Sequence, residues 1–115
     1  MHELGIANAV LETARTELRN HGDAHPQRLG LRVGDWSGVD PEALRFCLNV
    51  LMQDTEFACT ELEIERCPRR NRCPECRIDF PVIDYDVHCP SCGATNTEVS
   101  GGTELALAFI ELEEV

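Results

Sequence analysis

The sequence has 115 residues and a formal net charge of −11, because 21 acidic side chains outnumber ten basic ones, all of which are arginine. This length predicts one compact domain, with room for a small appendage. No apolar run approaches the roughly 20 residues of a membrane-spanning helix, and the first residues do not resemble a secretory signal, so we expect a cytoplasmic protein with no membrane partner. The acidic balance argues against nucleic acid as the main partner, since phosphate binding needs a basic surface.

Cysteine is abundant in this chain, which contains seven such residues. Four of them form two C-x-x-C pairs, "CPEC" at 73–76 and "CPSC" at 89–92, with twelve residues between the pairs. An odd number of cysteines with this spacing favours metal-bound thiolates in a reducing compartment over a framework of disulfides.

The first predicted element is an amphipathic helix over residues 3–20. Apolar residues recur there at three- and four-residue spacing, and charged residues fill the opposite face. Gly22 is placed to end the helix in a left-handed conformation. The stretch "RLGLRV" at 28–33 alternates apolar and polar residues, which predicts a strand. The side chains expected to face the core are Leu4, Ala7, Leu11, Ala14 and Leu18, followed by Leu29, Leu31 and Val33.

A second helix is predicted from residue 41 to about residue 53. Asp40 suits its N-cap, Pro41 its first position, and Glu42 the favourable end of the helix dipole. The stretch "ELEIERC" at 61–67 alternates again and predicts a second strand. The side chains expected to be buried are Leu44, Cys47, Leu48 and Leu51 of the helix, and Leu62 and Ile64 of the strand.

Composition changes sharply at Pro68, and up to Ser100 the chain is rich in cysteine, proline and arginine. The final stretch "TELALAFIELEEV" has apolar residues at both odd and even positions, so both faces of a strand would be apolar. This pattern is typical of a central strand or of one covered on both faces. We therefore predict an α+β fold in which two helices pack on a small mixed three-stranded sheet. Residues 1–67 and 101–115 would form this α/β domain, and residues 68–100 an inserted, zinc-ribbon-like structural domain.

The two cysteine pairs predict a tetrahedral zinc site made by four thiolates, those of Cys73, Cys76, Cys89 and Cys92. The two-residue gap lets both sulfurs of a pair reach one ion, and Gly93 permits a sharp turn after the second pair. Four protein ligands leave no open position for catalysis, so the ion is structural. An insert of this size without an apolar core also needs a cross-link, which the metal ion would provide.

Other functions of the same residues stay open at this point. A thiol oxidoreductase would use the C-x-x-C pairs as redox centres. A nucleic-acid-binding or regulatory zinc ribbon would use the arginines of residues 69–77, which could instead contact an acidic protein. The low aromatic content, 5%, argues against base stacking. No nucleophilic triad, paired catalytic carboxylates or glycine-rich phosphate loop is present, so we expect no enzyme.

The cysteines and histidines outside these two pairs need separate interpretation. His88 precedes Cys89 and is either an alternative zinc ligand at low pH or a surface residue. Cys47 is expected on the buried side of the second helix, and Cys67 is expected to pack rather than to bind metal, because its gap to Cys73 fits no ligand pair. We expect the remaining histidines, His21 and His25, to be exposed.

The amino terminus offers a second group of metal ligands. His2 is too large for ready removal of the initiator methionine, so we expect the α-amine of Met1 to persist beside the amide and imidazole of His2. Amine and amide can close a five-membered chelate ring, amide and Nδ1 a six-membered one, and Glu3 can supply a fourth donor. Four donors in a plane suit Ni(II) or Cu(II). An ordinary helix start explains the same residues, and the pattern alone does not decide.

Taken together, the segments "MHELGIA" and "LRVGDWSGVDPEALRFC" and the paired C-x-x-C insert resemble the HypA/HybF family over essentially the whole chain. Members of that family are nickel metallochaperones of NiFe-hydrogenase maturation. The resemblance implies Ni(II) binding by Met1, His2 and Glu3, and structural Zn(II) held by the four cysteines. It also matches Asp40 to an acidic position near the nickel, although the N-cap role already explains that residue.

The resemblance further implies a non-enzymatic carrier with Ni(II) as its transient cargo. Such a carrier would cooperate with a HypB-type GTPase and deliver the ion to the large-subunit precursor of NiFe-hydrogenase, and in some organisms to urease. Members that exchange zinc ligands with pH have histidines flanking both cysteine pairs. This sequence has only His88 there, so the resemblance does not extend to that exchange.

Overall fold

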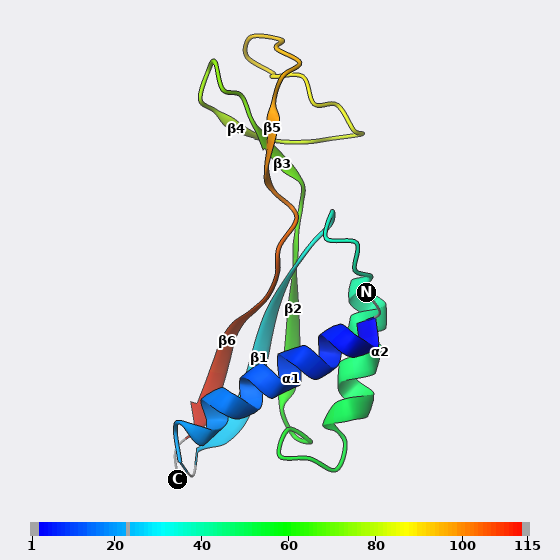
Figure 1. Cartoon of the computed structure of the whole chain (residues 1–115), viewed down its shortest axis with the longest axis vertical. Coiled ribbons are helices and arrows are strands. Elements are labelled where there is room, and N and C mark those ends of the chain that lie inside the picture. The colour runs from blue at the N-terminus through cyan, green and yellow to red at the C-terminus, as the bar shows by residue number, and fades with distance from the viewer. Residues whose placement is uncertain (1–2, 23, 114–115) are drawn as a thin grey trace.

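The computed structural model describes residues 3–22 and 24–113, which form an elongated molecule with extents of 55 × 26 × 18 Å (Figure 1). It contains two helices and two separate three-stranded sheets, with strand orders β2-β1-β6 and β4-β3-β5. The elements in chain order are α1 (Glu3–Arg19), β1 (His25–Gly34), α2 (Pro41–Met52), β2 (Glu61–Cys67), β3 (Arg70–Arg72), β4 (Asp79–Pro81), β5 (Glu98–Gly101) and β6 (Leu105–Glu113). The predicted fold class is confirmed. Within the described residues, neither helix is long and apolar enough to cross a membrane.

The larger sheet is mixed, as predicted, with β1 in the middle. β1 pairs in parallel with β2 and antiparallel with β6. Leu29, Leu31 and Val33 of β1 are at most 1% exposed, and they pack against the apolar sides of α1 and α2. The one-sided alternation in β1 therefore fits a sheet with helices on one face and solvent on the other.

Helix α1 follows its predicted range, but its buried stripe begins at a different residue. Ala7, Leu11 and Ala14 are buried, whereas Leu4 is 51% exposed and Ile6 is buried in its place. The first turn extends toward the start of α2 (Figure 1), and the side chain of that turn that enters the core is Ile6 rather than Leu4. The prediction that Leu4 is a core residue was wrong for this reason. Gly22 has a φ of 66°, as its predicted cap role requires.

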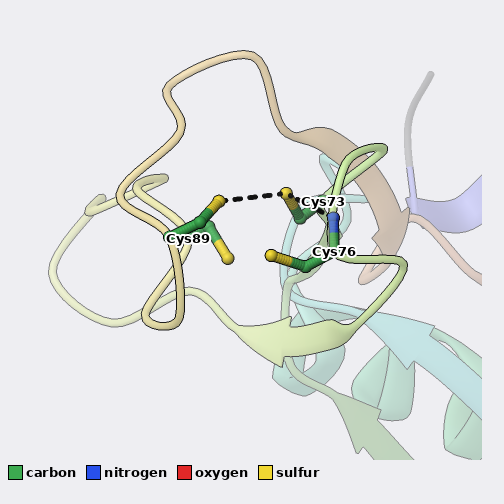
Figure 2. Close-up of side chains that lie close together, drawn as sticks. Cys73, Cys76 and Cys89 are labelled. Atoms are coloured by element: carbon green, nitrogen blue, oxygen red, sulfur yellow. Dashed lines mark hydrogen bonds between the residues drawn. The ribbon is translucent and has the colours of Figure 1, made fainter.

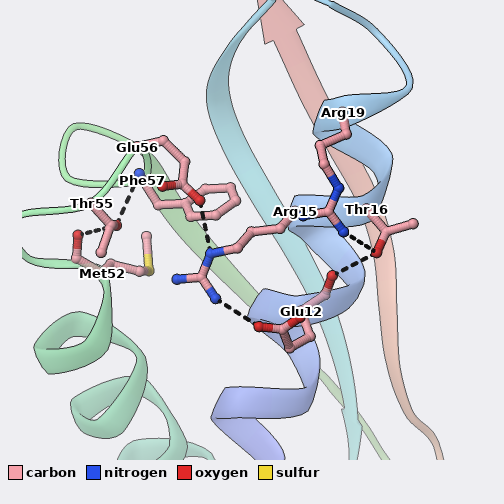
Figure 3. Close-up of polar contacts among 8 residues, drawn as sticks. All are labelled: Glu12, Arg15, Thr16, Arg19, Met52, Thr55, Glu56 and Phe57. Atoms are coloured by element: carbon pink, nitrogen blue, oxygen red, sulfur yellow. Dashed lines mark hydrogen bonds and ion pairs between the residues drawn. The ribbon is translucent and has the colours of Figure 1, made fainter.

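Arg15 ties α1 to the loop that follows α2 (Figure 3). Its Nε donates to Glu56 at 2.8 Å and its Nη1 to Glu12 at 3.2 Å. The guanidinium also lies 5.9 Å from the ring centre of the fully buried Phe57. The polar contacts of Arg15 therefore cover the edge of the core, where Phe57 fills the space between the two helices.

Strand β6 is an edge strand, and the expectation of a central strand or one covered on both faces was wrong. Its register against β1 shifts between Gly30 and Leu31, which leaves Ala108 unpaired as a bulge. A bulge reverses the side-chain parity, so Leu107 and Ile110 both pack on the core while Phe109 lies on the open face. A Cβ on Gly30 would lie 2.0 Å from the Phe109 ring, so this ring covers the glycine directly.

Candidate metal centres

The two C-x-x-C pairs adopt the same backbone turn. In the first, the amide of Cys73 donates to Ile78 O at 3.0 Å and that of Arg77 to Cys73 O at 2.7 Å. In the second, the amide of Cys89 donates to Ala94 O at 3.0 Å and that of Gly93 to Cys89 O at 2.9 Å. The fourth residue after the first cysteine has a positive φ in both turns, 61° at Arg77 and 76° at Gly93. Only Gly93 could be recognised from the sequence, because arginine rarely adopts this conformation.

The turns bring four sulfur atoms together (Figure 2), all within 4.8 Å of one another. Cys73 and Cys92 Sγ are 3.7 Å apart, and the amide of Cys76 lies 3.4 Å from Cys73 Sγ. Cys73 and Cys89 are almost completely buried. A set of four convergent thiols at this separation is suited to a tetrahedral thiophilic ion, for which Zn²⁺ is the usual choice in proteins.

Backbone amides already favour the charged form of one of these thiols. The N–H of Cys92, and after it that of Ser91, lowers the pKa of the Cys89 thiol to about 7. Hydrogen bonding to Cys92, together with burial, raises the pKa of Cys76 to about 12. A metal ion would replace the protons that the thiols share, so binding must release protons.

The cysteines and histidine outside this cluster do not join it. His88 Nδ1 lies 2.8 Å from Asp86 Oδ1, and its side chain is exposed. Cys67 is buried at the end of β2, as predicted for a packing residue, and Cys47 is half-buried against the core. Cys59 is exposed in the loop before β2. The four cysteines thus form the one such cluster found within the described residues.

A short β-sheet that sequence analysis did not predict supports the cysteine cluster. Strand β3 pairs with β4 on one side and with β5 on the other. Phe80 of β4 packs against Cys73 and Cys89. Asn71 of β3 is 1% exposed, and its amide donates to Thr97 Oγ1 at 3.0 Å. The strands are only three or four residues long, which is too short for a clear alternating pattern.

Of the predicted nickel ligands, Met1 and His2 lie outside the described residues, but Glu3 is described. Glu3 Oε2 accepts a hydrogen bond from the backbone N–H of Asp40 at 3.3 Å. Asp40 is the N-cap of α2, where its Oδ1 accepts from the Glu42 amide at 3.0 Å. The fold therefore brings the start of α1 to the start of α2, and Glu3 to Asp40, although 37 residues separate them in sequence.

The turn between β1 and α2 connects this end of the molecule with the cysteine-containing sheet. The amide of Trp36 donates to Gly102 O at 2.7 Å and that of Asp35 to Cys67 O at 2.8 Å. The Arg69 guanidinium lies 3.8 Å from the centre of the Trp36 ring, and Tyr85 meets the same ring edge-on at 6.2 Å. One arginine of the 69–77 cluster thus stacks on a half-exposed tryptophan of the same chain, a role that sequence spacing could not reveal.

Close backbone approach makes this connection compact. A Cβ on Gly34 would lie 2.0 Å from Gly102 O, and one on Gly102 would lie 2.5 Å from Arg69 Cα. Gly102 also has a φ of 101°. Glycine is required at both positions, because any side chain would push the two connecting segments away from the end of β1.

Comparison with known proteins identifies one family along the chain. The family described as "Hydrogenase/urease nickel incorporation, metallochaperone, hypA" matches residues 1–112. The hydrogenase maturation factor HypA of Geobacter metallireducens is 37% identical over 113 residues, covering 98% of this chain and 100% of the relative. The HypA of Chlorobaculum parvum is 34% identical with the same coverage.

Two solved structures share the fold. The solution structure of the nickel metallochaperone HypA from Helicobacter pylori matches with a TM-score of 0.66 and 19% identity, over 97% of each chain. A second structure, titled "Solution structure of HypA protein", matches with a TM-score of 0.73 and 20% identity, over 98% of this chain and 97% of the other. The chain therefore belongs to the HypA family of hydrogenase maturation factors, which are nickel metallochaperones rather than enzymes.

Proposed function

We propose that the chain binds Ni(II) at Met1, His2 and Glu3 and delivers it, with a HypB-type GTPase, to the large-subunit precursor of NiFe-hydrogenase. The observation that carries this proposal is the contact between Glu3 and the Asp40 amide. It anchors Glu3, the third of the proposed ligands, at the acidic start of α2. A site at the end of the chain suits a carrier, because a terminal chelate can open without unfolding the core.

The carboxylates around this end favour a cation. Glu3 and Asp40 lie in contact through the Asp40 amide, and Glu42 follows in the first turn of α2. Asp40 Oδ1 accepts the N-cap bond, and the second oxygen of the same carboxylate can serve as a further ligand, so Asp40 contributes charge to the site and can also bind the ion. The amine and amide of the first two residues would provide the planar donors that Ni(II) prefers.

We further propose that Cys73, Cys76, Cys89 and Cys92 hold a structural Zn(II). The support is the convergence of their sulfur atoms within 4.8 Å and the shared turn of the two pairs. Residues 68–100 would then be a structural zinc domain inserted between residues 1–67 and 101–115 of the nickel-binding domain. A reducing compartment such as the cytoplasm would keep these thiols available for the metal.

Nickel titration of untagged protein tests the terminal site. We expect His2→Gln to weaken Ni(II) binding at least tenfold, about 1.4 kcal/mol, because one of the planar donors is lost. His21→Gln is the matched control, since His21 is exposed beyond the other end of α1 and should leave affinity unchanged. Equal nickel affinity in the wild type and His2→Gln would disprove the site.

A second variant isolates the role of the Met1 amine. Two residues, Ala-Ser, are placed ahead of Met1, since a single added residue would put histidine third and create another terminal chelate. We expect nickel affinity to fall as in His2→Gln while zinc content stays at one ion per chain. Unchanged nickel affinity would show that the amine is not a ligand.

Delivery is tested with the partner GTPase and the hydrogenase precursor together. We expect nickel to move from the loaded wild-type chain into the precursor when the GTPase is present, as measured by nickel content of the isolated precursor. The His2→Gln chain should transfer no nickel above the background of free Ni(II). Equal nickel transfer with and without the GTPase would contradict the proposed partnership.

A further inference from the structure

The two edges of the larger sheet differ in how well they are covered. On β2, Arg45 of α2 donates to Leu62 O at 3.2 Å, and Glu61, Glu63 and Glu65 alternate along the strand. Capping side chains and charges are the usual means of protecting an edge strand from pairing with other chains. On β6, no side chain of the described residues donates to a backbone carbonyl of Leu105–Glu113.

β6 is also the longer edge, with nine residues against seven in β2. It pairs with β1 on one side only, so every second residue directs its backbone N–H and C=O outward. Figure 1 shows β6 along the outer side of the sheet, with α1 crossing in front of it. Unpaired groups along such a strand are the hydrogen-bonding surface that an extended peptide can use.

An apolar groove runs beside this edge, between β6 and α1. It consists of two adjoining hollows of about 330 and 310 Å³ that share Thr13 and Leu107. Ile6 and Val10 line it from the helix, and Leu105 and Leu112 line it from the strand. Alternate side chains of an added strand would enter this groove while its backbone pairs with β6.

The charge on the groove indicates the partner. Glu17 is the one carboxylate among the lining residues, none of which is an arginine, and no arginine of the described chain forms an ion pair with it. A second copy of this chain is a poor occupant. Antiparallel pairing of two β6 strands would bring Glu111 and Glu113 of one toward Glu104 of the other, and each chain carries a net charge of −11.

We infer that the β6 edge and its groove are a docking site for an extended segment of another protein, with alternating apolar side chains and a basic residue that meets Glu17. The segment would add a fourth strand to the sheet. This inference does not depend on where nickel binds, because its test uses a metal-free peptide and measures the backbone amides of β6.

The probe is the capped peptide Arg-Val-Thr-Val-Thr-Val-Thr, titrated into isotope-labelled, zinc-loaded protein. We expect the amides of β6 to shift and to gain protection from hydrogen exchange. Two N-methylated versions, each methylated at one alternate set of residues, separate the two sides of the added strand. One set should weaken binding at least about tenfold, because it removes the donors that face β6, and the other should bind like the parent peptide.

Variants of the groove complete the test. Thr13→Arg, at an exposed position shared by both hollows, should weaken peptide binding at least about tenfold by filling the groove and pairing with Glu17. Asn8→Arg places the same charge on an exposed position of α1 outside the groove and should bind like the wild type. A parent peptide with glutamate in place of arginine should bind more weakly.

Several results would overturn the inference. These are an absence of shifts in β6, equal binding of both methylated peptides, or wild-type binding by Thr13→Arg. Protection of β6 amides that rises with protein concentration alone would also overturn it, because the occupant would then be a second copy of the chain.

Discussion

The two sheets of this protein are held together in different ways. Eleven buried residues form one cluster between the larger sheet and the two helices. The smaller sheet buries Cys73, Phe80 and Cys89, and two of these three are proposed zinc ligands. Apolar burial therefore stabilises the first region, whereas the second has too little of it to fold unaided. With zinc bound as proposed, the metal site would take the place of a core in this short segment.

The two regions also differ in net charge. Residues 68–100 contain four arginines and five carboxylates, whereas the rest of the chain contains six arginines and sixteen carboxylates. The larger region is therefore strongly acidic, and the insert is almost neutral. An acidic region is suited to hold a cation at its exposed end and to select basic partners. The neutral insert has no comparable electrostatic role, which agrees with a structural function.

Removing the metal should separate the two regions most clearly. We expect a strong chelator, or Cys73→Ala, to unfold β3, β4 and β5, because structural zinc contributes an apparent binding free energy of about 10–16 kcal/mol. The amide NMR signals of α1, α2 and the larger sheet should persist. Cys59→Ala, at an exposed cysteine outside the cluster, is the control. Loss of signals from both regions at once would contradict independent stabilisation.

A cavity in the core should have the opposite effect. Leu48 of α2 is completely buried, so Leu48→Ala should lower the free energy of unfolding of the larger region by about 2–5 kcal/mol in a urea titration. Zinc content should stay at one ion per chain. Val50→Ala, at a 48% exposed position of the same helix, should change stability by less than about 0.5 kcal/mol. Zinc loss in Leu48→Ala would show that the two regions fold together.

Zinc affinity should fall as the solution becomes more acidic. Hydrogen bonding and burial raise the pKa of Cys76 to about 12, so this thiol must release its proton to bind metal at any physiological pH. We therefore expect affinity to decrease at least about tenfold per pH unit between pH 8 and pH 6, as measured with a competing chelator. Cys89, with its pKa lowered to about 7 by the Cys92 amide, adds to this slope below pH 7. An affinity independent of pH would show that the thiols are not the ligands.

The smallest expected effect on zinc affinity is that of replacing Arg77. Its φ of 61° matches that of Gly93 in the equivalent turn, a conformation that costs a side chain about 1 kcal/mol. We expect Arg77→Gly to increase zinc affinity by up to about fivefold, and Gly93→Ala to decrease it by a similar factor. The larger region should not change in either variant. Effects of the same sign at both positions would argue that the turns are not equivalent.

Much of the fold could be predicted because its signals are local. The N-cap of α2 at Asp40, the left-handed conformation of Gly22 and the alternation of Leu29, Leu31 and Val33 all depend on neighbouring residues, and the structure confirms them. The spacing of the four cysteines likewise places their sulfur atoms together, because each pair closes its own turn. Backbone geometry within a few residues decides these features.

Tertiary structure alone decided the features that depend on distant residues. The bulge at Ala108 reverses the parity of β6, so an alternation read along the chain could not place Phe109 over Gly30 or show that β6 lies at an edge. Stacking of Arg69 on Trp36 joins segments that only the fold brings together. The sequence by itself determined which residues carry the groups proposed to bind metal. Packing of α1 against α2 determined that Glu3 lies at Asp40, because such contacts depend on how whole elements pack rather than on local propensity.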